Sequence, residues 1–150
     1  MSTLPPKLTA LIDELRGVTD RYERAELLIE IADRFPESKV TPEVAQEPYP
    51  EDRRAPACES DAFVWGVDQP DGTVKFYFDV LNPQGLSAKA MSVILDESAS
   101  GAPLEQVAAL QDDVVFDIFG KELSMGKGAG LMGILAMVRQ EARKRMLPAS

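Results

Sequence analysis

The sequence predicts an α+β fold, in which helices flank a small antiparallel sheet, and three observations support this. Apolar residues recur every three or four positions in the first 35 residues and again after residue 86. Two central runs, 62–67 and 73–80, instead alternate as strands do, with the turn residues DQPDG between them. The chain has 150 residues, 45% of them hydrophobic, which suits a single domain over residues 1–150.

Two helices are expected at the N-terminal end. Residues 8–18 carry leucine and isoleucine at helical spacing. A second helix begins with Asp20, where Glu23 completes a capping box, and it ends at Pro36. We expect the two segments to form a helical hairpin over the core.

The segment from residue 36 to residue 56 has a different character. It has no periodicity and contains five of the eleven prolines. Proline fixes φ and disfavours helix at the residue before it, which predicts a stiff, extended and functional loop. Because a stable sheet usually needs a third strand, we expect that strand within residues 39–57.

The predicted hairpin should have one apolar face, since Val74, Phe76, Phe78 and Val80 alternate with more polar residues. The rest of the chain reads as helical. Ser87 is the expected cap of a helix that stops near residue 101, and PLEQVAAL and DDVVFDIFG predict short helices or turns. Ser124 precedes a final helix. These C-terminal helices should pack on one face of a sheet of about three strands.

Composition excludes several classes of function. The chain has no histidine and one cysteine, so serine or cysteine catalysis assisted by histidine and a structural zinc site are both excluded. No metal site is expected. The net charge of −9 argues against a nucleic-acid partner. Neither a secretory signal nor a membrane span is recognisable, and a lone cysteine suits a reducing compartment, so we expect a cytoplasmic protein without a membrane partner.

A formal G-x-G-x-x-G motif, GAGLMG, lies at residues 128–133. A dinucleotide site would require a strand immediately before it within a βαβ unit, and no such unit is predicted. The favoured interpretation is close backbone packing at a helix start, which glycine permits.

The single cysteine, Cys58, lies in a predicted loop just before the first strand. Arg53 and Arg54 favour a thiolate there, whereas Glu59 and Asp61 oppose it, so the sequence leaves the balance open. Because no second thiol exists to attack a bound sulfur, a sulfur or thiol carrier ranks above a redox sensor, and both rank above an inert core thiol.

Four blocks of the sequence resemble the SufE family of sulfur-acceptor proteins, and they follow the family's order. They are DRYERAELLIEIADRFPE, APACESDAFVW, LSAKAMSVILDESASGAPLEQV and ELSMGKGAGLMGILAMVRQEA. The sequence departs from the family at Ala57, where glycine is usual, at Lys127 (arginine) and at Ala129 (asparagine). Trp65 also lies two residues further from the cysteine than in the common pattern.

The resemblance implies a SufE/NifU-like fold and a mechanism. Cys58 would accept persulfide sulfur from a pyridoxal-phosphate cysteine desulfurase, stimulate that enzyme, and pass sulfur to an iron–sulfur cluster scaffold. The chain would then need no cofactor, since pyridoxal phosphate belongs to the partner, and it would not be an enzyme in its own right. The resemblance also implies candidate residues of the loop and pocket (Arg53, Arg54, Ser60, Trp65) and of partner binding (Glu59, Asp61, Lys127).

Two other functions stay open at this point. The chain could be an adaptor that binds a desulfurase or scaffold without transferring sulfur. It could also be a single-cysteine redox sensor.

Overall fold

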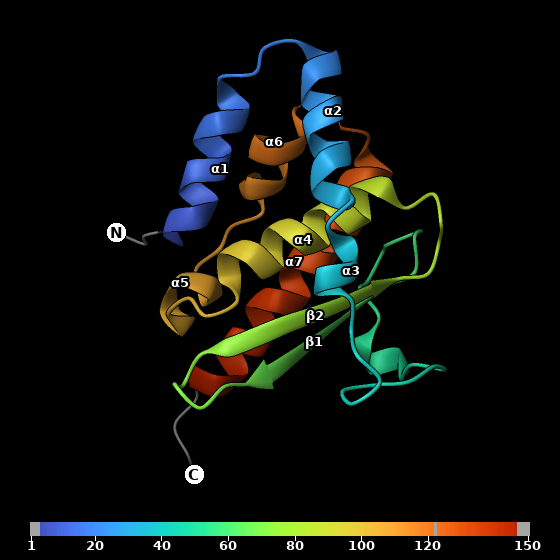
Figure 1. Ribbon diagram of the computed structural model, residues 1–150, viewed down its shortest axis with the longest axis vertical. Helices are drawn as coiled ribbons and strands as arrows, with labels where there is room; N and C mark the ends of the chain where they lie inside the picture. Colours follow the sequence, from blue (N-terminus) through green and yellow to red (C-terminus); the bar gives the residue numbers. More distant parts are fainter. Residues whose placement is uncertain (1–3, 122, 147–150) are drawn as a thin grey trace.

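The computed structural model describes residues 4–121 and 123–146, which form an α+β fold (Figure 1). The described elements, in chain order, are α1 (Pro6–Arg16), α2 (Arg21–Ala32), α3 (Phe35–Ser38), the 3₁₀ helix η1 (Glu51–Arg53), β1 (Ala62–Asp68), β2 (Val74–Val80), α4 (Leu86–Ala99), α5 (Leu104–Ala108), α6 (Asp113–Phe119) and α7 (Met125–Met146). Within the described residues, no helix is long and apolar enough to cross a membrane.

The core lies between the β-hairpin and the C-terminal helices. α4 packs on β2 and α7 packs on β1, and the two helices also contact each other (Figure 1). The alternating residues of β2 point into this core as predicted. Phe76 and Phe78 are fully buried, and Val74 and Val80 are 1% and 6% exposed. The prediction of C-terminal helices on one face of the sheet therefore holds.

The sheet has two strands in the described residues, so the expected third strand was wrong. β1 and β2 pair antiparallel from Ala62↔Val80 to Asp68↔Val74. The segment that was expected to supply a strand contributes one isolated bridge on each side, Lys39 to Phe78 and Arg54 to Phe63. Its prolines lack the N–H group that a continuous ladder requires.

Individual hydrogen bonds, not a third strand, pair the backbone groups on the outer edge of β2. The amide of Val40 donates to the carbonyl of Phe78 (2.8 Å), and the amide of Gly101 donates to that of Val74 (3.1 Å). The amide of Phe76 donates to the hydroxyl of Ser100 (2.8 Å). These hydrogen bonds explain how the outer edge of β2 avoids being left open.

The second face of the hairpin carries a separate aromatic cluster. Phe63 and Trp65 pack with Val40 and Tyr49 from the proline-rich segment. The Tyr49 hydroxyl donates to the buried carboxylate of Asp79 (2.6 Å). Residues 36–56 are therefore not extended throughout, since they include η1 and all of α3 except its first residue.

The expected N-terminal helical hairpin is not confirmed. α1 packs against α4 and α6, while α2 packs against α4, and α6 lies between α1 and α2 in Figure 1. The apolar face of α1 packs against these later helices. Periodicity predicts that α1 has an apolar face, but not which helices that face contacts. Arg24 of α2 links the segments instead, donating to the carbonyls of Leu15 (2.8 Å) and Ile118 (2.9 Å).

The helix caps follow the prediction in part. The carboxylate of Asp20 accepts from the amides of Tyr22 and Glu23, and the Ser124 hydroxyl accepts from the amide of Lys127. Two predictions were wrong. α2 ends at Ala32, and Pro36 lies in the first turn of α3, where a missing N–H costs nothing. Ser87 lies inside α4, which begins after Gly85.

Candidate functional site

Cys58 lies on a short loop whose two ends are held together. We call residues 55–62 the cysteine loop. At its neck the amide of Ala55 donates to the carbonyl of Ala62 (2.8 Å), and Arg54 forms an ion pair with Asp61. Farther along, the carbonyl of Asp61 accepts from the amide of Leu81 (3.2 Å). The loop is therefore a closed unit between η1 and β1, and its thiol is half-buried.

Two residues of the cysteine loop have left-handed backbone conformations. Ala57 has φ 61° and Asp61 has φ 52°. A left-handed conformation costs a residue with a Cβ roughly 1–2 kcal/mol, and aspartate tolerates it better than alanine. The structure thus gives a physical reason for the glycine that the resemblance predicts at position 57.

Replacing Ala57 should change stability in an order set by this backbone angle. We expect Ala57→Gly to raise the free energy of unfolding by about 0.5–1 kcal/mol, since glycine relieves the strain but adds freedom to the unfolded chain. Ala57→Val should lower it, because a β-branched residue at positive φ is strained further. Urea unfolding of both variants measures the order. A loss of stability in Ala57→Gly would contradict it.

Two of the three glycines of the G-x-G-x-x-G motif, Gly130 and Gly133, form the surface on which the cysteine loop rests. A Cβ placed on Gly133 would lie 2.1 Å from the carbonyl oxygen of Pro56, and one on Gly130 would lie 3.2 Å from the Cα of Cys58. Both glycines are inside α7, and the described element directly before α7 is the helix α6, not a strand. The motif therefore serves close backbone packing, as the sequence interpretation favoured, and we call Gly130 and Gly133 the glycine face of α7.

Cys58 lines a pocket of about 320 Å³. Its walls come from the cysteine loop, the start of α4 and the start of α7, and they comprise Cys58, Glu59, Ser60, Gln84, Gly85, Leu86, Ser87, Ala88, Ser124, Gly126, Lys127, Gly130 and Leu131. No side chain caps the N-terminus of α4. Free N–H groups and the helix dipoles give such ends partial positive charge, which favours an anion such as ionised sulfur.

The structure brings some of the predicted residues together and separates others. Glu59, Ser60 and Lys127 line the pocket with Cys58. Arg53 instead pairs with Glu141 of α7 (3.1 Å), and Arg54 pairs with Glu51 and Asp61. Neither arginine lines the pocket.

Trp65 and Asp61 also lie outside the pocket lining. Trp65 belongs to the aromatic cluster on the other face of the hairpin. The alternation of side chains along β1 could have predicted this position, because Trp65 must share a face with Phe63 and not with Val64.

The start of α4 is the part of the pocket that sequence reasoning did not find. Gly85 is essential to its shape, since a Cβ there would lie 2.8 Å from Val80 and 3.0 Å from Ser60. The NPQG turn before α4 was the feature of the sequence that could have pointed to this part of the pocket. Among the described residues, no group of three or more His, Cys, Asp or Glu side chains is placed to hold a metal ion.

Fold and site together define a class of protein: a small α+β domain that presents one thiol on a closed loop resting on helix ends. The protein-family model described as "SufE: Fe-S metabolism associated domain" matches residues 9–142. The chain therefore belongs to the SufE family and is associated with iron–sulfur metabolism.

The fold is also found in a solved structure. The solution structure of a hypothetical protein from Thermus thermophilus matches with a TM-score of 0.75 and 24% sequence identity, over 96% of this chain and 98% of that chain. At this identity the likeness supports the fold alone. Comparison with curated proteins gives no significant match.

Proposed function

We propose that this protein is a sulfur acceptor that carries persulfide sulfur on Cys58 for iron–sulfur cluster assembly. Family membership supports the metabolic context. The observation that carries the proposal is the placement of the chain's single thiol, half-buried on a closed loop at a pocket formed by two helix N-termini. Such a pocket is suited to an anionic sulfur, and no neighbouring thiol is present to discharge a bound one.

The transfer step is a thiol–persulfide exchange. The thiolate of Cys58 attacks the outer sulfur of a persulfide on the donor enzyme's cysteine. A bond forms between the Cys58 sulfur and that outer sulfur, and the bond between the outer sulfur and the donor cysteine breaks. The donor leaves as a thiolate, and Cys58 becomes a persulfide. The oxidation level of the transferred sulfur is conserved, so no external oxidant or reductant is needed.

The proposed partners follow from this chemistry. A cysteine desulfurase that holds pyridoxal phosphate supplies the sulfur, and a cluster scaffold receives it. The chain itself is proposed to act without a cofactor, as a carrier and activator in the reducing cytoplasm. Glu59 and Lys127 are exposed at the pocket rim, and Asp61 lies at the loop neck, where a docked partner would meet them.

The test is the mass of Cys58 after exposure to a donor. The protein is incubated with a cysteine desulfurase and L-cysteine, then digested and analysed by mass spectrometry. We expect one added sulfur on the Cys58 peptide, removable by dithiothreitol. This last step matters, because a sulfinic acid has nearly the same added mass and resists thiol reductants. Cys58→Ser should show no addition and should not stimulate the desulfurase.

The Cys58→Ser variant and a peroxide assay distinguish the other two functions. If Cys58→Ser stimulates the desulfurase as well as the natural protein does, the protein is an adaptor and the transfer proposal fails. If Cys58 gains oxygen from dilute peroxide faster than a free thiol, and gains no sulfur from the enzyme, it is a redox sensor.

A further inference from the structure

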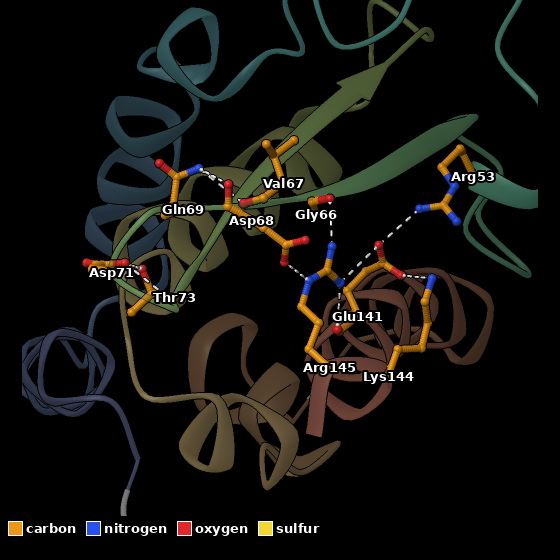
Figure 2. Close-up of polar contacts among 10 residues, drawn as sticks. All are labelled: Arg53, Gly66, Val67, Asp68, Gln69, Asp71, Thr73, Glu141, Lys144 and Arg145. Atoms are coloured by element: carbon orange, nitrogen blue, oxygen red, sulfur yellow. Dashed lines mark hydrogen bonds and ion pairs between the residues drawn. The ribbon is translucent and has the colours of Figure 1, made fainter. Parts of the chain in front are cut away.

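A buried carboxylate on α7 reaches the segment that leads into the cysteine loop. Glu141 is 5% exposed, and it accepts a hydrogen bond from Arg53 at the end of η1 (3.1 Å). Figure 2 shows this contact beside a second one, in which Lys144 donates to the other carboxylate oxygen (2.7 Å). One carboxylate therefore joins a loop-side cation and a helix-side cation.

Glu141 is held firmly in its position. The pKa of Glu141 lies below its ordinary value: burial raises it, but the hydrogen bond from Lys144 and the charges of Arg53 and Lys144 lower it by more. The carboxylate is therefore ionised at neutral pH. Arg145 adds a further constraint, since it binds the carbonyls of Glu141 (2.8 Å) and Gly66 (3.0 Å) (Figure 2).

Gly66 of β1 makes room for this arrangement. A Cβ at that position would lie 3.2 Å from the Oε1 atom of Glu141, closer than side chains normally approach. The carboxylate is thus fixed between the strand and its own helix, and Arg53 is the partner that comes from outside these two elements.

Other contacts between the cysteine loop and α7 are weaker in kind. The loop rests on Gly130 and Gly133 through van der Waals contact, and its neck contacts join the loop to itself and to the adjacent Arg54. Among the described residues, Arg53–Glu141 is the ion pair that joins segment 51–61 to α7. Both side chains are largely shielded from water, with 22% and 6% exposed, so breaking this pair costs more than breaking a surface pair.

We propose that Glu141 is a positioning residue for Cys58. Acting through Arg53, it sets where the entry to the cysteine loop lies on α7, and so how fully the thiol is seated in its pocket. This assignment concerns the position of the thiol, and it holds whether or not Cys58 carries sulfur.

The experiment measures alkylation of Cys58 by iodoacetamide in the folded protein. Because Cys58 is the only cysteine in the chain, the total rate reports on this site alone. We expect Arg53→Ala and Glu141→Gln each to speed alkylation roughly tenfold, the scale of one lost charged hydrogen bond. The double variant should react no faster than either single one, and Arg53→Lys should restore part of the slow rate.

Lys144→Ala is the matched control, because it removes a cation from the same carboxylate on the helix side. It should leave the alkylation rate near that of the natural protein. Urea unfolding is measured for every variant, since a merely structural role would make alkylation follow global stability. Natural rates in Arg53→Ala and Glu141→Gln would overturn the proposal. So would an equal acceleration in Lys144→Ala, or rates that simply follow stability.

Discussion

Gly133→Ala should displace the cysteine loop and lower the free energy of unfolding by about 1–3 kcal/mol. The new methyl group would lie 2.1 Å from the carbonyl oxygen of Pro56, and this neighbour is backbone that cannot rotate away. Alanine gains up to about 1 kcal/mol over glycine as a helix former, which offsets part of the loss. Urea unfolding measures the stability, and alkylation of Cys58 should become faster because the loop leaves its place.

Gly128→Ala is the matched control within the same motif and the same helix. Its added methyl group would lie 3.6 Å from the Leu123 side chain, which is ordinary contact. We expect it to be tolerated or slightly stabilising, with unchanged alkylation of Cys58. If Gly128→Ala and Gly133→Ala had equal effects, the glycines would not act through contact with the loop.

Asp96→Ala should strongly lower the free energy of unfolding, at a position outside the pocket lining. The Asp96 carboxylate is 7% exposed and accepts from three side chains: Ser38 of α3 (2.7 Å), Lys75 of β2 and Ser100 after α4 (2.7 Å). Its removal leaves these groups without their partner. We expect a loss of about 2–4 kcal/mol, somewhat below the usual cost of breaking a buried pair, because Lys75 is partly exposed.

Glu97→Ala provides the comparison, since it removes the adjacent acidic residue of the same helix. Glu97 pairs with Arg34 through two hydrogen bonds of 2.8 Å, but the side chains of Arg34 and Glu97 are 45% and 43% exposed. A surface pair of this kind contributes up to about 1 kcal/mol. Urea unfolding of the two variants compares a buried carboxylate with an exposed one. Equal losses would contradict the role given to Asp96.

Prediction from the sequence succeeded where the signal was local. The alternation of β2 and the DQPDG turn predicted the hairpin and its buried face, and periodicity predicted the helices. Asp20 was correctly predicted as a cap because a cap depends on the next few residues. Prediction failed for the third strand and the N-terminal hairpin, which depend on the surface that each segment meets.

For the site, too, the features that depend on composition or on nearby residues could be predicted from the sequence. The composition of the chain was enough to single out Cys58 and to exclude catalysis assisted by histidine. The lack of a predicted strand before the glycine motif was enough to argue against a nucleotide-binding loop. Each of these conclusions rests on which residues are present, or on neighbours within one turn or strand.

Folding added the relations between distant residues. Arg53 pairs with a carboxylate 88 positions away, and Gly133 accommodates the Pro56 carbonyl. Arg53 and Arg54 could each have faced the thiol, yet both pair with carboxylates, because a buried or half-buried charge is costly without a partner. Such pairings depend on which helix faces meet in three dimensions, and hydrophobic periodicity carries no information about that choice.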